Sequence, residues 1–399
     1  MSMNETSSGE RIHISFFGKR NAGKSSLVNA VTSQNLSVVS EVKGTTTDPV
    51  KKSMELLPLG PVVITDTAGI DDEGELGSLR VQKTFETLSR TDIAVFVADA
   101  TAEISDDEKK FIAILQERKI PFIIARNKCD LLAEIPKDTP NAPNEIFVSA
   151  ATGINISELK ERLGKIRGDF QTSKRIIADL ISRGDIVVLV IPIDQSAPKG
   201  RIILPQQATI RDVLDSNAIF ISCQPQELKQ TLESLAKKPR LVVTDSQAFG
   251  EVSKIVPREI PLTSFSILFA RYKGELSALI GGAEKLSALK DGERVLIAEA
   301  CTHHRQCRDI GTVQLPSMIK KFSGANVDFE FSSGTDFPAG LEKFALVVHC
   351  GGCMINETEM KNRLERAKEA GIPVVNYGIA LAKMNGILER SIEPVRNSI

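Results

Sequence analysis

Short apolar runs rich in β-branched residues alternate with helical patterns along almost the whole chain, and this alternation constrains the fold most strongly. The runs are five to seven residues long, the usual length of a fully buried strand. Strands that alternate with helices form parallel sheets whose faces the helices cover. The sequence therefore predicts α/β architecture built on parallel sheets.

The chain is long enough for several cores, and the pattern divides into three α/β modules. Its 399 residues exceed what one hydrophobic core usually supports. A polar stretch at 167–174 and the segment Pro257–Pro261 are the predicted linkers. We therefore expect domains at 1–170, 175–260 and 261–399. The predicted strands are Arg11–Phe17, Val62–Asp66, Ile93–Asp99, Pro121–Asn127 and Glu145–Ser149 in the first module, Ile186–Ile191, Ala218–Ser222 and Arg240–Thr244 in the second, and Arg294–Ala298, Asn326–Phe331, Phe344–His349 and Pro373–Asn376 in the third.

Composition argues against several classes of partner. Lys and Arg total 50 and Asp and Glu total 51, so no global basic field exists for nucleic acid or an anionic membrane. No apolar run approaches the roughly 18 residues of a membrane span, and the first ten residues are polar rather than signal-like. We expect a cytoplasmic protein that binds neither nucleic acid nor membrane.

A phosphate-binding loop follows the first predicted strand. The segment from Gly18 to Ser25 reads GKRNAGKS, the pattern of a P-loop, and it precedes a helical pattern as that motif requires. Glycines let backbone N–H groups point at phosphates, and a helix N-terminus adds positive potential. We expect Lys24 to reach the β- and γ-phosphates and Ser25 to ligate Mg²⁺. Gly18, Gly23 and Ser26 complete the predicted loop.

Two further segments have the composition of GTPase switches. Asp66 ends a strand and is predicted to hold the Mg²⁺ hydration shell, while Gly69 offers its N–H to the γ-phosphate. In the GTTTD segment, Thr46, or else its neighbour Thr45, is predicted to complete Mg²⁺ coordination. Ile70 follows Gly69 where Ras-like proteins carry a water-orienting Gln. Slow intrinsic hydrolysis follows from that difference.

The motifs that read the base predict guanine rather than adenine. Asn127-Lys128-Cys-Asp130 ends another strand, and the Asp130 carboxylate matches the N1–H and exocyclic amine of guanine. Ser149-Ala150 ends a fifth strand and is predicted to present a backbone N–H to the guanine oxygen. Four motifs in this order, each at a strand end, define a GTP site with Lys24 as its central residue. The predicted fold of the first module is thus a P-loop G domain.

Asn21 in the P-loop indicates that a second cation binds beside Mg²⁺. The pattern resembles the tRNA-modification branch of the translation-factor-related GTPases, and Asn21 stands at the position that carries the resemblance. In that branch the equivalent Asn helps to bind K⁺, which substitutes for an arginine finger when G domains dimerise. The resemblance implies K⁺-stimulated hydrolysis; an ordinary turn-capping role is the alternative.

Cysteine and histidine gather in the last hundred residues, at two strand ends. Edges formed by the carboxyl ends of parallel strands are where ligands bind, so two such groups can converge. The spacing is compatible with a structural Cys₃His zinc site, with a [4Fe–4S] cluster whose fourth iron takes an exchangeable group, or with unrelated buried thiols. The residues concerned are Cys301, His303, His349, Cys350 and Cys353.

A G domain joined to CTH and HCGGC segments resembles the HydF family, the maturation GTPase and scaffold of [FeFe]-hydrogenase. The resemblance covers the G domain, the middle domain and the last domain. It implies a [4Fe–4S] cluster held by Cys301, Cys350 and Cys353, with His303 and His349 as a labile fourth ligand or as supporting donors. It also implies homodimerisation through the middle domain, for which apolar positions in Ile186–Ile191 are a candidate surface.

The resemblance further implies partners: two radical-SAM maturases that supply a di-iron precursor, and the apo-hydrogenase that receives it. Cys307 lies outside the family pattern and is predicted to be a surface thiol, whereas Cys129 and Cys223 are predicted to be small packing residues.

Two rival functions remain open. One is a tRNA- or ribosome-associated GTPase with a structural zinc site, which the absence of Trp and the presence of only two Tyr disfavour. The other is an electron-transfer enzyme, which needs a fourth firm Cys ligand.

Overall fold

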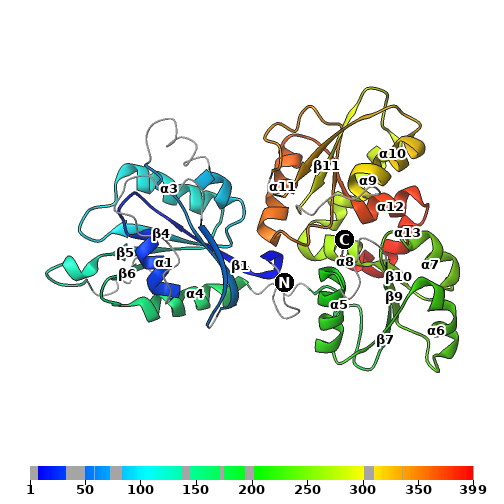
Figure 1. Ribbon diagram of the computed structural model, residues 1–399, viewed down its shortest axis with the longest axis horizontal. Coiled ribbons are helices and arrows are strands. Elements are labelled where there is room, and N and C mark those ends of the chain that lie inside the picture. Colours follow the sequence, from blue (N-terminus) through cyan, green and yellow to red (C-terminus); the bar gives the residue numbers. More distant parts are fainter. Residues whose placement is uncertain are drawn as a thin grey trace. The chain divides into compact units, whose positions relative to one another are not determined.

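The chain is represented by a computed structural model that describes residues 8–32, 50–57, 59–71, 83–136, 144–170, 175–193, 202–300, 310–334 and 336–398. It separates into two units, Met1–Thr172 and Ser173–Ile399 (Figure 1). Three sheets of mainly parallel strands are present within the described ranges, one in the first unit and two in the second. The prediction of parallel-sheet α/β modules is confirmed.

The first unit is built on a sheet whose described strands lie in the order β2-β3-β1-β4-β5-β6. All neighbouring pairs are parallel except β2 and β3, which are antiparallel. The sequence analysis had not predicted the edge strand β2, in which half-buried and exposed residues alternate. The strands are β1 Ile12–Phe17, β2 Val50–Leu56, β3 Gly60–Asp66, β4 Ile93–Asp99, β5 Phe122–Asn127 and β6 Glu145–Phe147.

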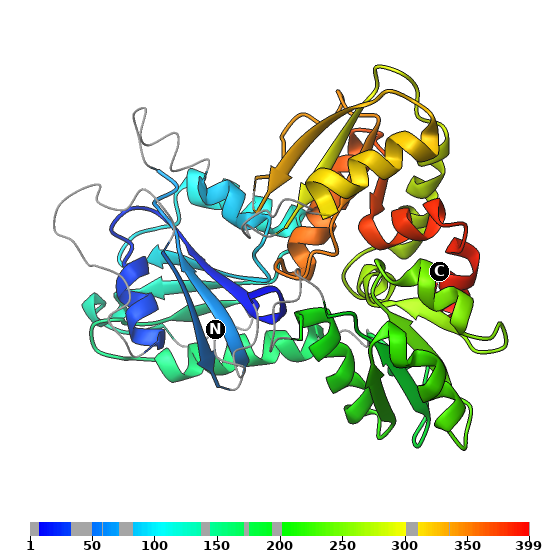
Figure 2. The same cartoon turned by 45° about the vertical axis from the view of Figure 1, so that its right-hand side comes forward.

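Helices cover both faces of this sheet (Figure 2) because successive strand residues point to opposite sides. In β1, Ile14 and Phe16 belong to the core cluster shared with α1 (Lys24–Thr32) and α4 (Ile156–Phe170). The next residue, Phe17, belongs instead to the cluster of α3 (Asp106–Glu117), where its ring lies 5.2 Å from that of Phe111. The P-loop therefore leaves a strand that is buried on both faces.

The second unit holds two parallel sheets on one continuous hydrophobic core. The described strands of one sheet lie in the order β10-β9-β7-β8, and those of the other in the order β12-β11-β13-β14. Gly282 in α9 shows how closely these layers pack, because a Cβ there would lie 2.0 Å from the Val374 carbonyl oxygen. The strands are β7 Ile186–Val190, β8 Ile219–Cys223, β9 Leu241–Thr244, β10 Leu262–Ser264, β11 Arg294–Glu299, β12 Asp328–Ser333, β13 Leu346–His349 and β14 Val374–Asn376, and the helices are α5 Leu204–Asp215, α6 Leu228–Ser234, α7 Phe249–Ile255, α8 Phe265–Lys273, α9 Leu276–Ser287, α10 Leu315–Ser323, α11 Glu357–Glu369, α12 Tyr377–Met384 and α13 Leu388–Ile392.

Two expectations about the middle module change with the structure. The predicted linker Pro257–Pro261 connects α7 to β10, and β10 pairs in parallel with β9, so the segment is a loop inside one sheet. The candidate dimer surface Ile186–Ile191 forms the interior strand β7, whose residues Val187 to Val190 are fully buried. An interior strand that pairs on both sides reads as a continuous apolar run, which explains the prediction. The exposed apolar strand is its neighbour β8 at the sheet edge.

Candidate functional site

The P-loop is held in a conformation that only glycine permits at two positions. Gly18 has a φ of +146°, and a Cβ there would lie 2.1 Å from the Val97 carbonyl oxygen. Gly23 has a φ of +88°, and a Cβ there would lie 2.2 Å from Nδ2 of Asn127. The loop thus approaches β4 and the end of β5 too closely for a side chain at either glycine.

The two residues predicted for phosphate and Mg²⁺ begin α1. Lys24 is buried, and its Nζ donates to the carbonyl oxygens of Gly18 at 2.9 Å and Lys19 at 2.7 Å. Ser25 Oγ donates to Asp66 Oδ2 at 2.6 Å. A hydroxyl and a carboxylate that meet in this way are the oxygen donors that Mg²⁺ prefers. The residues of the chain therefore fit the ion that the fold implies.

Asn127 joins the base-reading motifs to the P-loop. Its Nδ2 donates to the Ala22 carbonyl oxygen at 3.0 Å, and its Oδ1 accepts from the Ala150 N–H at 3.0 Å. With 2% of its surface exposed, Asn127 acts as an internal brace, whereas Asp130 is exposed and open to a ligand. Three of the four predicted motifs are thus interlocked through one side chain.

Asp99 is a site residue that the sequence analysis did not single out. It ends β4 and accepts a hydrogen bond from Nζ of Lys128 at 2.6 Å. Burial raises the pKa of the Asp99 carboxyl, but the hydrogen bonds from Lys128 and Thr101 outweigh it and hold the pKa below its usual range. Asp99 therefore stays ionised and orients Lys128; its place at a strand end beside the NKCD motif was the available signal.

The remaining predicted residues of this site are distributed as follows. Gly69 packs against the P-loop, since a Cβ there would lie 2.6 Å from Cγ of Arg20. Ser149 is fully buried and lies beyond the end of β6. Asn21 is exposed with a φ of +59°. Ser26 follows Ser25 in α1. Thr45 and Thr46 lie outside the described residues.

A second site lies where β11 and β13 end side by side. The Cys350 N–H donates to the Ala298 carbonyl oxygen at 2.9 Å, so the strand pairing continues into the HCGGC segment. The Ala300 N–H donates to Cys350 Sγ at 3.0 Å, and the Gly352 N–H lies 3.4 Å from the same sulfur. Ala300 directly precedes the predicted ligand Cys301 in the sequence. The chain next to Cys301 therefore contacts the sulfur of Cys350, a second predicted ligand.

Two backbone N–H groups and an apolar shell surround the sulfur of Cys350. Burial raises the pKa of the Cys350 thiol to about 11, although the N–H groups of Ala300 and Gly352 act in the opposite direction. Hydrogen bonds of this kind to cysteine sulfur tune iron–sulfur clusters, and an apolar shell excludes water from them. That shell contains Ala300, Ile355 and Met360. Within the described ranges no group of three or more His, Cys, Asp or Glu could hold a metal ion, and Cys301, His303 and Cys307 lie outside those ranges.

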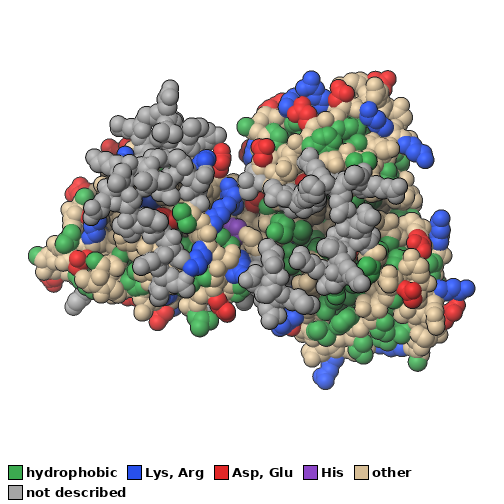
Figure 3. All heavy atoms as spheres, in the orientation of Figure 1, with side chains coloured by type: hydrophobic (Ala, Val, Ile, Leu, Met, Phe, Trp, Pro, Cys, Tyr) green, Lys and Arg blue, Asp and Glu red, His purple; other side chains and the backbone are tan. Residues whose placement is uncertain are grey.

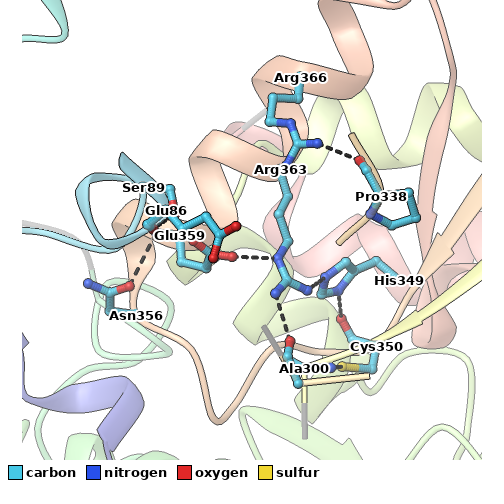
Figure 4. A network of polar contacts seen from close by, with 11 residues as sticks. Glu86, Ser89, Ala300, Pro338, His349, Cys350, Asn356, Glu359, Arg363 and Arg366 are labelled. Atoms are coloured by element: carbon cyan, nitrogen blue, oxygen red, sulfur yellow. Dashed lines mark hydrogen bonds and ion pairs between the residues drawn. The ribbon is translucent and has the colours of Figure 1, made fainter. Parts of the chain in front are cut away.

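His349 is engaged at both ring nitrogens (Figure 4). Nδ1 lies 2.7 Å from the Cys350 carbonyl oxygen, and Nε2 lies 3.1 Å from Nη1 of Arg363. Burial, reinforced by the positive charge of Arg363, lowers the pKa of His349 to about 3. The ring is therefore neutral, with Nδ1–H donating to Cys350 and Nε2 accepting from Arg363. In this arrangement His349 braces the backbone of Cys350.

Arg363 is a second residue that the sequence analysis did not identify. It is 2% exposed, and its Nε donates to Glu359 Oε1 at 2.9 Å while its Nη2 donates to the Gly334 carbonyl oxygen at 2.8 Å. Its guanidinium lies 5.0 Å from the ring centroid of Phe337. This one side chain therefore joins α11, the segment after β12 and the histidine beside Cys350.

The architecture defines the class of protein: the first unit is a P-loop GTPase domain. A family model described as a 50S ribosome-binding GTPase matches residues 13–128. The tRNA modification GTPase MnmE of Endomicrobium trichonymphae is 36% identical over 163 residues, which are 39% of this chain and 36% of that protein. GTPase Der of Kosmotoga olearia is 29% identical over 223 residues, or 51% of this chain and 50% of that protein. The chain thus spans between about a third and a half of the length of these relatives.

The second unit narrows the class to one family. The hydrogen maturase F dimerization domain matches residues 176–274, and the hydrogen maturase F tetramerization domain matches residues 277–394. The chain belongs to the hydrogen maturase F (HydF) family, as the sequence predicted. Among solved structures, Era of Aquifex aeolicus bound to GDP·AlF4⁻ is 19% identical, with a TM-score of 0.35, over 61% of this chain and 97% of that one. None of the helices that the structure describes has the length and apolarity to span a bilayer.

Proposed function

We propose that the chain is a GTP-hydrolysing scaffold of hydrogenase maturation. It binds a [4Fe–4S] cluster with one exchangeable iron site and delivers a di-iron precursor to apo-[FeFe]-hydrogenase. The observation that carries the proposal is the contact between the Ala300 N–H and Cys350 Sγ, in a chain whose second unit matches two maturase domains. That contact brings the segment that leads into Cys301 to the HCGGC turn.

On the nucleotide side, the chain supplies positioning and charge. Lys24 lies among carbonyl groups of the P-loop, from which its ammonium would turn to the β- and γ-phosphates of GTP. Ser25 and Asp66 would hold Mg²⁺, which neutralises charge on the phosphates, and Thr46 or Thr45 would complete its shell. Because Ile70 stands where a water-orienting Gln would serve, intrinsic turnover is slow.

K⁺ is the proposed accelerator of this slow reaction. Asn21 is exposed in the P-loop and has a left-handed backbone, with a φ of +59°. Replacement of Na⁺ by K⁺ is expected to raise the turnover of the wild type but not that of Asn21→Ala. Equal rates of GTP hydrolysis by the wild type in K⁺ and in Na⁺ would contradict the proposal.

On the cysteine side, Cys301, Cys350 and Cys353 would hold the cluster, which supplies an iron with an open position. Cys350 would be oriented by the N–H groups of Ala300 and Gly352, and His349 would brace its carbonyl group rather than occupy the fourth iron position. His303 remains the candidate for a labile fourth ligand. The second unit is proposed to divide into a dimerisation and a cluster-binding domain, as expected at 175–260 and 261–399. The pairing of β10 with β9 supports a boundary after β10 rather than before it.

Homodimerisation is proposed through the edge strand β8. Its outer side carries no strand partner among the described residues, and Ile219 on β8 and Leu214 on α5 are each about half exposed, at 51% and 52%. Figure 3 shows apolar side chains on the part of the second unit that carries α5 and β7, and positive and negative charges interspersed over the same face. An apolar open edge favours strand pairing with a second copy, and mixed charge does not favour nucleic acid.

Anaerobic purification tests the proposal. Wild-type chain is expected to bind about four iron and four sulfide ions, with a broad brown absorbance and an EPR signal that added imidazole perturbs. One tightly bound zinc in colourless protein would instead support a structural metal site in a tRNA- or ribosome-associated GTPase. A reversible electron carrier with a fourth cysteine ligand would show no response to imidazole.

A further inference from the structure

The last turn of α8 places a buried lysine against the cysteine turn. Lys273 is 2% exposed, and its Nζ donates to the carbonyl oxygens of Ile355 at 2.9 Å, Gly352 at 3.3 Å and Cys353 at 3.4 Å. The same ammonium lies 5.9 Å from the ring centroid of Phe269, one turn earlier in α8. The residue belongs to the segment that matches the dimerization domain, whereas the turn belongs to the tetramerization domain.

Gly352 connects the ammonium with the cysteine sulfur through its backbone. Its carbonyl oxygen accepts from Lys273, and its N–H lies within hydrogen-bonding distance of Cys350 Sγ. Its φ of +65° allows both contacts, and a Cβ there would lie 2.2 Å from Cε of Met360. Lys273 therefore holds carbonyl groups on one side of the turn, while the turn offers an N–H to sulfur on the other.

The turn of α8 that carries Lys273 is itself held in place. Arg271 forms a bidentate ion pair with Asp179, with distances of 2.7 and 2.8 Å, and also donates to the carbonyl oxygens of Arg175 and Ile176. These contacts attach α8 to the first segment of the second unit. A lysine on such a turn has little freedom to follow the cysteine segment, so the lysine constrains the segment.

We infer that Lys273 is a positioning residue of the cysteine turn, and that its buried charge stabilises an anionic group bound by Cys350 and Cys353. The carbonyl oxygens of Gly352, Cys353 and Ile355 accept from the ammonium and fix its position beside the turn. A thiolate-bound cluster is anionic, so a buried cation beside the turn that carries the thiolates favours it. The identity of the anionic group rests on the proposed function; the positioning role does not.

The positioning role is tested in the metal-free full chain by hydrogen–deuterium exchange. Lys273→Met keeps most of the side-chain volume and removes the charged donors, so exchange in residues 350–356 is expected to rise about tenfold or more. Lys383→Met is the matched control, because Lys383 pairs with Glu284 on the surface and is expected to leave the cysteine turn unchanged. If Lys273→Met does not fold, Lys273→Gln must show the same rise. Unchanged exchange in a folded Lys273 variant overturns the inference.

The charge is tested in anaerobically loaded chain by the midpoint potential of the bound cluster. Loss of a nearby positive charge makes reduction harder, so Lys273→Met is expected to have a lower potential, which Lys273→Arg restores and Lys383→Met does not alter. Equal potentials in all variants would remove the electrostatic part of the inference. If the wild type binds no cluster, the proposed function fails, while the exchange result still decides the positioning role.

Discussion

Two buried lysines in this chain perform similar tasks through different chain geometry. Lys24 donates to the carbonyl oxygens of Gly18 and Lys19 in its own loop, six and five residues away. Lys273 donates to the carbonyl oxygens of a glycine-containing turn that includes Gly352, about eighty residues away. In both sites the loop presents its carbonyl groups to an ammonium. One site is encoded in a single segment, and the other is assembled by the fold.

This difference in chain geometry predicts how each site responds to amino-acid substitution. A locally encoded loop depends on its own strand and helix, so its substitutions should affect the nucleotide reaction and leave the cysteine site intact. An assembled site depends on packing between sheets, so substitutions in several distant elements should reach it. The predictions below test that contrast.

Lys24→Ala should have the largest effect on the nucleotide side. Removal of the ammonium is expected to lower the rate of GTP hydrolysis by about a hundredfold to a thousandfold or more, because Lys24 is the residue expected to reach the β- and γ-phosphates. Phosphate release measures the rate. Lys19→Ala, in which the backbone acceptor remains, should lie close to the wild type, and the iron content of both variants should be unchanged. Loss of iron in Lys24→Ala would contradict the expectation that the nucleotide site and the cysteine site respond independently.

Cys353→Ser should abolish cluster binding while GTP hydrolysis stays within about twofold of the wild type, because the proposed cluster has only three thiolate ligands and the variant removes one. Iron and sulfide analysis after anaerobic reconstitution measures the effect. Cys223→Ser removes a half-buried thiol on β8 and should keep the full iron content. Full iron in Cys353→Ser would exclude that residue from the ligand set.

Arg363→Met should destabilise the second unit by about 3–5 kcal/mol, because it leaves Glu359 buried without this partner and takes a donor from His349. Arg211→Met is a matched control, since Arg211 and Asp215 have the same helical spacing but are exposed, and its loss should cost about 0.5 kcal/mol or less.

Tyrosine fluorescence during urea unfolding isolates this effect. The chain has no Trp, and its two tyrosines, Tyr272 and Tyr377, both lie in the second unit. Equal unfolding free energies for the two arginine variants would show that the buried network contributes nothing beyond a surface pair.

The smallest expected effect is a pH dependence of the first unit. Burial lowers the pKa of His13 in β1, with the carboxylate of Asp92 acting in the opposite direction. Below the ordinary histidine pKa of about 6.5, the unfolded chain takes up a proton that the folded chain refuses, so stability falls as pH falls and is fully present above that value. Circular dichroism during unfolding measures this pH dependence, because it follows the first unit, which tyrosine fluorescence does not report. His13→Gln should reduce the slope of stability against pH. An unchanged slope would mean that other groups cause the pH dependence.

The same contrast explains what the sequence could predict. Motifs within one segment, such as the P-loop and the NKCD run, were placed correctly at strand ends, because strand and helix patterns are local. The buried central strands were found for the same reason. β2 was missed because it is polar, with adjacent lysines Lys51 and Lys52, as on an exposed edge. β10 was missed because it is only three residues long behind a Pro-rich loop.

Residues that act across sheets left no local signal. Lys273 reads as the basic end of a helix, and Arg363 as one of several charges in α11. Their burial depends on which strands become neighbours, and no spacing in the sequence specifies that. The prediction that β11 and β13 converge came from a general rule for parallel sheets, which is why it located the cysteine edge but not the side chains that brace it.

The most direct test of the account compares Cys301→Ser with Cys307→Ser after anaerobic reconstitution of the full chain. If the ends of β11 and β13 share one cluster, Cys301→Ser loses its iron and sulfide, whereas Cys307→Ser retains about four of each. Full iron in Cys301→Ser, or equal loss in both variants, would contradict a three-cysteine cluster with one open iron site.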